Sequence, residues 1–314
     1  MGAWMERREW KNRRVFISGG AGVIGQPLVE ALLEAGAILF VGDLKPEPAA
    51  WKGRLHYRQG DLISLSRDEI SQFAPQTFFH LAAAFERSHE EYGFWTDNFH
   101  HNVHLSHHLM TLCKDLPALQ SVVFASSYLI YDPNLYLFTI SRPCISLKEE
   151  SPVNPRNLCG MAKLMHEKEL QFIREYRPEL QVICARIYRS YGRQSRDIIS
   201  RWIQAGLKKE PLMVFCEEGQ FDYIFADDIA QALLGLGSLS FSGVVNVATG
   251  RSRSVKEVVA CLQKNFFGLQ VEHKEVQMPI EASQADISLL KLLLPEWSAQ
   301  TIEQAIPKLI EFYS

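Results

Sequence analysis

A glycine-rich turn close to the N-terminus is the feature that most constrains how this chain folds. The apolar run Val15-Phe16-Ile17-Ser18 leads directly into Gly19-Gly20-Ala21-Gly22-Val23-Ile24-Gly25, and an apolar helical pattern follows. In a strand–turn–helix unit, Gly19 permits the tight turn, Gly22 lets the backbone approach a phosphate, and Gly25 allows close packing of helix on strand. The helix N-terminus then presents free N–H groups to the phosphates. The turn therefore predicts a dinucleotide-binding unit.

Short apolar segments alternate with helical segments over the first two thirds of the chain. Strands are predicted at 15–18, 38–43, 55–59, 77–82, 121–126 and 181–186, with helices at 22–35, 95–113 and 157–176. Short buried strands joined by helices form parallel sheets with right-handed crossovers. The predicted fold class is therefore α/β, a Rossmann-type doubly wound parallel sheet.

The regular alternation breaks down after Tyr191. Helices are predicted at 198–207, 226–236 and 255–265, among short strands such as 244–247. We expect an N-terminal extension at 1–13 and a dinucleotide-binding Rossmann domain at 14–190. Residues 191–314 are expected to form mainly a smaller substrate-binding lobe, from which the chain crosses back to the sheet.

Composition and charge exclude several classes of function. The formal net charge of −3 offers no general attraction to nucleic acid or to anionic membranes. We find no apolar run long enough to span a membrane, and the first fourteen residues lack the apolar core of a signal peptide. The six cysteines are scattered without a CxxC pair, which is typical of reduced thiols. We therefore expect a cytoplasmic protein.

Asp43 ends the second predicted strand, where a carboxylate can accept hydrogen bonds from both hydroxyls of a ribose. This position favours NAD over NADP because the carboxylate repels a 2′-phosphate. Lys45 lies close by in the sequence and offsets part of that charge, so NADP remains the alternative.

Further segments accompany the glycine turn in a fixed order. They are Gly60-Asp61-Leu62, His80-Leu81-Ala82-Ala83, Asn102, Phe124-Ala125-Ser126-Ser127 with Tyr131, Arg186 to Gly192, Asp222-Tyr223-Ile224 with Asp228, and Val245 to Gly250. Together they resemble the extended short-chain dehydrogenase/reductase family, the sugar-nucleotide epimerases and dehydratases typified by UDP-galactose 4-epimerase. The likeness covers nearly the whole chain.

The resemblance implies NAD as the cofactor, with Asp61 holding the adenine amine. It also implies that two long helices, 95–113 and 157–176, pair with those of a second copy in a homodimer. The expected cofactor contacts are Gly19, Gly22, Val23, Ile24, Gly25, Asp43, Asp61, Leu62, Leu81, Ala82, Ala83, Asn102 and Lys163.

The chain departs from this family at the catalytic tyrosine. Family members place a Tyr and a Lys one helical turn apart, so that both point at the nicotinamide. Here Lys163 is in place, but Cys159 occupies the tyrosine position. A thiol is intrinsically more acidic than a phenol, and Lys163 is expected to favour the thiolate. The thiol is nevertheless too short to reach a sugar hydroxyl at the usual place.

Ser127 matches the family residue that hydrogen-bonds the reacting hydroxyl, although it also suits a role as a cap at the end of its strand. Tyr128 and Tyr136 are candidate replacements for the missing phenol, and Tyr131 matches a position that normally packs. Tyr136 lies in an insertion around 133–143 that is expected to form a loop over the active site. Ser127, Cys159 and Lys163 are thus the catalytic candidates, and Tyr128 is a substrate-binding candidate with Ser127.

Both arginines that clamp the nucleotide pyrophosphate in the family are replaced. Phe221 occupies one position, and the segment Pro279-Ile280-Glu281 replaces the motif that carries the other. Arg189 stands where the family has Asn, and Arg193 and Arg196 follow it. These residues form either a substitute anion clamp, with Arg189 and Arg193 binding substrate, or a solvated basic loop.

Histidines are concentrated in one predicted helix. A regular helix would place His100, His104, His107 and His108 on one face, a spacing that suits metal binding. No carboxylate or thiolate completes the set in the sequence, so we expect a solvated or interface role and no metal.

Two functions follow from these patterns. The first is an NAD-dependent enzyme that oxidises C4 of a nucleotide sugar with a non-standard acid/base, ending in epimerisation, reduction or a keto sugar. The second is a catalytically impaired NAD-binding member with a structural or regulatory role. We favour the enzyme because Ser127 and Lys163 are retained. The residues after Ser127 are Tyr128 and Leu129 instead of Asp-Glu, which argues against a standard 4,6-dehydratase.

Overall fold

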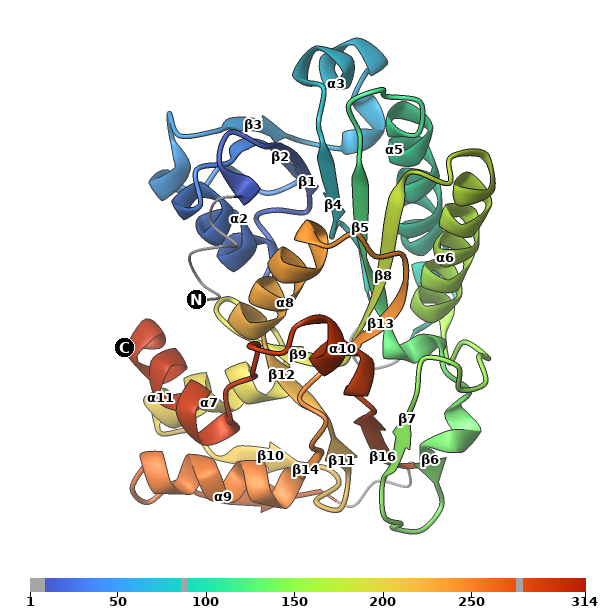
Figure 1. The fold of residues 1–314 in the computed structure, drawn as a ribbon. Coiled ribbons are helices and arrows are strands. Elements are labelled where there is room, and N and C mark those ends of the chain that lie inside the picture. The colour runs from blue at the N-terminus through green and yellow to red at the C-terminus, as the bar shows by residue number, and fades with distance from the viewer. Residues whose placement is uncertain (1–8, 86–89, 275–278) are drawn as a thin grey trace. The chain divides into compact units, whose positions relative to one another are not determined.

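The computed structural model of the protein describes residues 9–85, 90–274 and 279–314 (Figure 1). The chain forms two compact units. The first unit contains the described residues up to Tyr131, together with Val153–Arg186 and Ala230–Val245. The second unit contains Asp132–Pro152, Ile187–Ile229 and the described residues from Asn246 onward.

The first unit is built on a seven-stranded sheet. Its strands, in spatial order, are β13 (Gly243–Val247), β8 (Gln181–Ile187), β5 (Ser121–Ser127), β4 (Thr77–His80), β1 (Arg14–Ser18), β2 (Ile38–Asp43) and β3 (His56–Gln59). Strands β1 to β5 pair in parallel, because the intervening helices return the chain to the same edge. The predicted Rossmann-type α/β fold is confirmed.

Helices cover both faces of this sheet. They are α2 (Gly25–Glu34), α3 (Arg67–Phe73), α4 (Phe94–Asn98), α5 (Leu105–Cys113), α6 (Leu158–Tyr176) and α8 (Ala226–Ser238). In Figure 1, α5 and α6 run side by side on one face, while α2 and α8 lie on the other. Aromatic side chains fill the core, with Phe16 stacked on Phe78 at 4.8 Å between ring centroids.

Parallel pairing brings the carboxyl ends of the central strands to one edge. Ser18 at the end of β1 lies opposite both Gly42 on β2 and His80 on β4. The residues that follow these strands are therefore neighbours, as is usual for ligand sites in doubly wound sheets. This edge carries most of the expected site residues.

One wide turn interrupts the predicted helix 95–113. The segment Phe99–His104 forms a π-helix, labelled η3, between α4 and α5. A π-turn holds one residue more than an α-turn, so side chains on either side of it no longer follow a regular helical face.

The second unit contains small sheets and peripheral helices. Its strands are β6 (Leu137–Phe138), β7 (Ile145–Leu147), β9 (Arg189–Tyr191), β10 (Leu212–Val214), β11 (Gln220–Phe221), β12 (Tyr223–Phe225), β14 (Arg253–Ser254), β15 (Val271–His273) and β16 (Ile280–Ala285). Its helices are α7 (Ile198–Lys208), α9 (Val255–Asn265), α10 (Ser288–Leu293) and α11 (Ile302–Tyr313). Strand β16 pairs with β6, β7 and β11.

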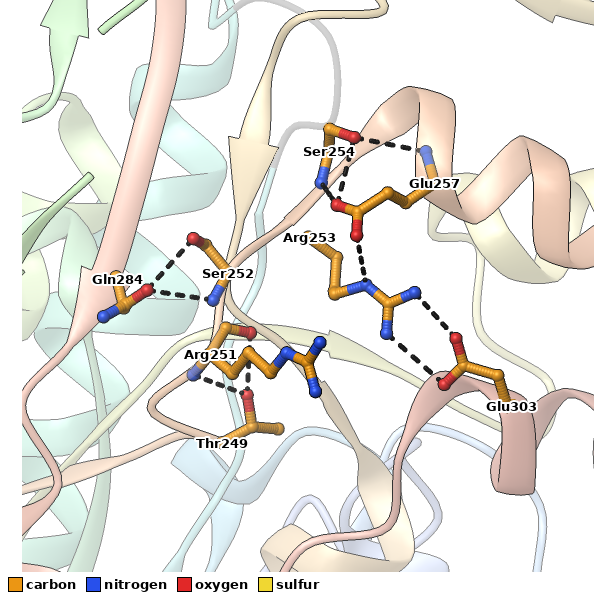
Figure 2. Close-up of polar contacts among 8 residues, drawn as sticks. All are labelled: Thr249, Arg251, Ser252, Arg253, Ser254, Glu257, Gln284 and Glu303. Atoms are coloured by element: carbon orange, nitrogen blue, oxygen red, sulfur yellow. Dashed lines mark hydrogen bonds and ion pairs between the residues drawn. The ribbon is translucent and has the colours of Figure 1, made fainter. Parts of the chain in front are cut away.

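Arg253 joins two helices of this unit. Figure 2 shows its guanidinium between Glu257 in the first turn of α9 and Glu303 in the first turn of α11, at 3.2 and 2.7 Å. Ser254 and Glu257 form a reciprocal capping box that starts α9. These contacts fix the start of both helices next to β14.

The division of the chain differs from the expected ranges in two places. Residues 132–152 belong to the second unit, where β6 and β7 pair with β16. The insertion around 133–143, expected to be a loop, therefore contributes the strand β6 to a sheet. Residues 230–245 return to the first unit. Part of the expected extension 1–13 also packs into the first unit, because Trp10 is fully buried against Phe79; residues 1–8 lie outside the described residues.

Candidate active site

The glycine turn has the geometry of a phosphate-binding loop. Gly19 has a φ of +77°, and a Cβ there would lie 2.5 Å from the backbone nitrogen of Ala82. A Cβ on Gly25 would lie 2.4 Å from the carbonyl oxygen of Gly19, so only glycine lets α2 start this close to β1. Within the described residues no side chain caps the N-terminus of α2. The Gln26 N–H bonds to the Gly22 carbonyl oxygen and Pro27 has no N–H, so the N–H groups left for a phosphate are those of Val23 to Gly25. The turn fits a dinucleotide.

Asp43 and Lys45 both hold the same turn. The Asp43 carboxylate accepts from the backbone N–H groups of Ala21 and Lys45, each at 2.9 Å. The Lys45 ammonium donates to the Ala21 carbonyl oxygen at 3.1 Å. Asp43 is thus fixed next to the turn, where we expect it to meet the adenosine ribose, and Lys45 is close enough to balance part of its charge.

Asp61 has a neighbour that the sequence did not indicate. One carboxylate oxygen accepts from the Ile63 N–H at 3.0 Å, and the other lies 2.6 Å from His100 Nε2. This bond to His100 lowers the pKa of Asp61 against the opposing effect of burial. Leu62, next in the chain, is buried and packs beside Gly42 on β2.

The histidines of the long helix do not share one face. His107 pairs with Glu169 on α6 at 2.6 Å, whereas His108 lies 3.1 Å from the Leu65 carbonyl oxygen. Asp61, His100 and His101 have ligand atoms within 4.8 Å of one another, which could hold a metal ion. Our argument that no carboxylate joins these histidines was therefore wrong. Exposed acidic groups are common without an ion, so we assign none there.

The segment after β4 is held by Asn102. Its side-chain amide donates to the Ala84 carbonyl oxygen and accepts from the Ala84 N–H, both at 2.7 Å. The segment Leu81–Ala83 runs directly before this anchor, with Ala82 against Gly19. Asn102 therefore positions the backbone that faces the cofactor turn, and a direct cofactor contact by Asn102 remains a prediction.

Lys163 is a buried cation near the carboxyl end of β5. Its side chain lies on the inner face of α6, and its residue is 8% exposed. The ammonium lies 4.7 Å from the centroid of the Phe124 ring, and within the described residues it makes no hydrogen bond or ion pair. Burial lowers the pKa of Lys163, and the nearby Cys159 opposes that effect. An ammonium in this position is ready to hold a ligand hydroxyl.

Cys159 lies in the first turn of α6 and is buried. Burial raises the pKa of its thiol, Lys163 lowers it, and the carboxylate of Glu90 raises it again. Lys163 favours the thiolate, as expected, but the net shift of the pKa is upward, so Lys163 does not make Cys159 a thiolate. Two effects on the thiol, desolvation and a neighbouring anion, outweigh one neighbouring cation.

Glu90 is the site residue that sequence reasoning missed. Its carboxylate accepts from the backbone N–H groups of Leu158 and Cys159, at 2.6 and 3.3 Å. No motif marks Glu90, and the residue lies 69 positions before Cys159 in the chain. Only the fold shows that a carboxylate stands beside the altered catalytic position.

Ser127 and the candidate tyrosines have defined places. The Ser127 hydroxyl oxygen accepts from the Leu129 N–H at 3.2 Å, which is the capping role considered above, and this leaves its proton for another acceptor. Tyr128 is buried at the end of β5, and Tyr131 packs under the Arg186 guanidinium at 4.8 Å. Tyr136 is fully buried in the second unit. None of these three phenols is exposed.

Arg189 and Arg193 belong to the second unit, and both face carboxylates. The Arg189 guanidinium lies 4.3 Å from the centroid of the Phe221 ring and 3.0 Å from a carboxylate oxygen of the buried Glu281. Arg193 lies 3.5 Å from Asp227. Substrate binding by these arginines remains a prediction, and their charges are already partly balanced.

In the described part of the chain, no helix is both long and apolar enough to cross a membrane.

Comparison with known proteins identifies the family. Residues 15–248 match the family described as "NAD dependent epimerase/dehydratase family". This chain belongs to that family. The predicted resemblance is thereby confirmed, and NAD as the expected cofactor is confirmed at the level of the family.

Individual relatives agree with this assignment. UDP-glucose 4-epimerase of Mycolicibacterium smegmatis is 26% identical over 265 residues, covering 78% of this chain and 80% of the relative. The solved structure of MoeE5 in complex with UDP-glucose and NAD is 27% identical, covers 95% of this chain and 98% of its own, and gives a TM-score of 0.81. A UDP-N-acetylglucosamine 4-epimerase from Methanobrevibacter ruminantium M1, at 23% identity, 96% and 98% coverage and a TM-score of 0.83, shares the fold.

Proposed function

We propose that this family member is an NAD-dependent enzyme that oxidises the C4 hydroxyl of a nucleotide sugar. NAD, when bound, accepts a hydride from the carbon that carries the reacting hydroxyl. The outcome is epimerisation, reduction or a released keto sugar. The observation that carries the proposal is the buried Lys163 ammonium without a hydrogen-bond partner among the described residues, on the helix that starts at the end of β5.

Each candidate residue of the first unit has a separate proposed role in binding NAD or the sugar. The glycine turn binds the pyrophosphate of NAD, Asp43 accepts from the adenosine ribose, and Asp61 receives the adenine amine. Lys163 holds the nicotinamide ribose, and Ser127 hydrogen-bonds the reacting hydroxyl. Relatives with UDP-sugars in their names support this substrate class. A homodimer and a cytoplasmic location complete the proposal.

The test is turnover of a panel of nucleotide sugars by the purified protein with NAD. We expect NADH formation at 340 nm or a changed sugar on chromatography. Lys163→Met should lower kcat/KM by about 10²-fold or more, because it removes a positioned cation. Lys168→Met is the matched control, since Lys168 is exposed on the same helix. Absence of turnover across the panel, or equal loss in both variants, would sink the proposal.

A further inference from the structure

The carboxylate of Glu90 lies beside the helical turn that carries Cys159, the residue at the position of the family's catalytic phenol. Its two oxygens accept from the N–H groups of Leu158 and Cys159, which fixes the carboxylate at the first turn of α6. The bond to the Cys159 N–H, at 3.3 Å, places the carboxylate beside the residue that carries the thiol. Each carboxylate oxygen keeps further lone-pair capacity, because a carboxylate has about four acceptor sites.

A second feature of the same site points to a ligand. Lys163, one helical turn after Cys159, is more than nine-tenths buried, and its ammonium has no hydrogen-bond or ion-pair partner among the described residues. A buried charge without a partner is costly unless a ligand completes its hydrogen bonds. The hydroxyl of Ser127, at the end of β5, also keeps its proton for an acceptor. The first unit therefore carries two donors, the Lys163 ammonium and the Ser127 hydroxyl, together with the Glu90 carboxylate.

We infer that Glu90 is the proton acceptor for the sugar hydroxyl in this enzyme, in place of the phenol that Cys159 lacks. This inference rests on the proposed function. The O–H bond of the substrate breaks, the proton forms a new O–H bond with Glu90, and the electron pair left on oxygen forms the carbonyl. The hydride leaves the same carbon for an oxidised nicotinamide, and the proton returns from Glu90 when the carbonyl is reduced.

The small side chain of Cys159 is part of this arrangement. A thiol ends one atom beyond Cβ, whereas a phenol at the same position extends across a ring into the space in front of the helix. The Glu90 carboxylate lies at the N-terminal end of the same helix, where it accepts from the N–H groups of Leu158 and Cys159. In this proposal the base is the Glu90 carboxylate at the start of α6, in place of a tyrosine on α6 itself.

A purely structural role for Glu90 makes a different prediction. A carboxylate that only caps α6 contributes to stability, and its loss lowers the melting temperature without a specific effect on turnover. Glu90→Gln separates the two roles, because the amide oxygen still accepts a backbone N–H but cannot take up a proton at neutral pH. Glu91→Gln is the matched control, since Glu91 is the exposed neighbour.

The first experiment measures turnover of the nucleotide sugar that the wild type converts. We expect Glu90→Gln to lower kcat by about 10²- to 10⁴-fold, the usual contribution of a general base, with NAD affinity unchanged within about twofold. Adding Cys159→Tyr to the Glu90→Gln variant should restore at least about tenfold, since it returns a phenol next to Lys163. Glu91→Gln should behave like the wild type.

The second experiment needs no cofactor or substrate. Modification of Cys159 by methyl methanethiosulfonate is followed by mass spectrometry in the wild type and variants. Glu90 raises the pKa of the thiol and Lys163 lowers it. Glu90→Gln should therefore react faster at neutral pH, Lys163→Met more slowly, and Glu91→Gln at the wild-type rate.

The outcomes distinguish this inference from the proposed function. If the wild type is active and Glu90→Gln keeps its kcat, or if Cys159→Tyr fails to restore turnover, the role of Glu90 is overturned while the function stands. An unchanged Cys159 reaction rate in Glu90→Gln overturns the placement of Glu90 itself. If the wild type converts no nucleotide sugar, the proposed function and the role of Glu90 fail together.

Discussion

At the scale of single residues, positions that depart from the family pattern contact one another. Arg189, Phe221 and Glu281 are three separate departures in the sequence. In the second unit the Arg189 guanidinium stacks on the Phe221 ring and pairs with the buried Glu281 carboxylate at 3.0 Å. Ser283 donates a further hydrogen bond to Glu281 at 2.8 Å. These residues form one cluster of contacts. We therefore expect the effects of substitutions within it on stability to be strongly coupled.

The glycine turn leads to a prediction for a single residue. Gly19→Ala places a Cβ 2.5 Å from the Ala82 backbone nitrogen and strains a φ of +77°. We expect NAD affinity to fall by at least about tenfold, because the turn must move away from the phosphates. The free energy of unfolding should also fall by about 1–3 kcal/mol. Isothermal titration with NAD and urea denaturation measure the two effects.

Gly53→Ala is the control for backbone strain alone. Gly53 has a φ of +73°, but a Cβ there meets nothing within 4 Å. It should lose some stability and bind NAD like the wild type. If Gly19→Ala binds NAD as tightly as Gly53→Ala does, the close approach of the turn to Ala82 is not required for binding.

Residues with a fixed spacing could be placed from the sequence, and others could not. Gly19, Ser127 and Lys163 follow strands or share a helix, so local pattern alone locates them near one edge of the sheet. Glu90 carries no such signal, because only the fold brings it to Cys159 from 69 residues away. The same is true of the contact between His100 and Asp61.

At the scale of elements, the predicted strands of the first unit agree closely with the structure. Buried parallel strands are short continuous apolar runs, and such runs are visible in a sequence. The π-turn Phe99–His104 was missed, because one extra residue in a turn leaves the helical pattern almost unchanged. Strands β6 and β7 were missed because two- or three-residue strands carry no periodicity.

Two buried histidines connect β4 with the helices that cover it. His80 is fully buried, with Nδ1 2.6 Å from the Ser18 hydroxyl and Nε2 2.8 Å from the Ser106 hydroxyl of α5. His166 on α6 lies 5.2 Å away between ring centroids, and its Nδ1 is 2.9 Å from Glu169. Burial, His166 and Lys163 hold the pKa of His80 well below its ordinary value of 6.5. Burial also lowers the pKa of His166, and Glu169 opposes that effect.

This arrangement predicts that mild acid destabilises the first unit. A histidine whose pKa is lowered on folding binds more protons in the unfolded state, so stability is present above about pH 6.5 and falls as the pH decreases from there. We expect the free energy of unfolding to drop by about 1–2 kcal/mol between pH 7.5 and 5.5. Urea denaturation at both pH values measures the change.

His80→Gln should reduce that pH dependence while lowering stability at pH 7.5. His273→Gln, at an exposed histidine of the second unit, is the control and should keep the wild-type slope. An equally steep loss of stability in His80→Gln would show that other groups account for the acid sensitivity.

At the scale of the whole molecule, the chain does not divide into consecutive halves. The second unit takes residues 132–152 from the middle of the chain, and the first unit takes back residues 230–245. Periodicity along the sequence cannot reveal such exchanges, because they depend on which sheet a short segment joins. The family resemblance located the motifs in both units but not the boundary between the units.

The first unit leaves apolar side chains exposed on two neighbouring helices. Met161, Met165 and Phe172 lie on the outer face of α6, opposite the buried residues of that helix, and are 51%, 60% and 60% exposed. Trp95 and Phe99, before α5, are 48% and 54% exposed. Exposed apolar side chains gathered on neighbouring helices are typical of an interface, which supports the predicted homodimer through these helices.

Phe172→Glu tests this interface. In a two-fold dimer each substitution places two charges against apolar surface, so we expect the variant to elute as a monomer while the wild type is a dimer. Light scattering coupled to size-exclusion chromatography measures the mass. Phe267→Glu is the matched control, because Phe267 is fully exposed in the second unit and outside the patch. A monomeric wild type would show that the chain forms no dimer. A Phe172→Glu variant that stays dimeric would place the interface elsewhere.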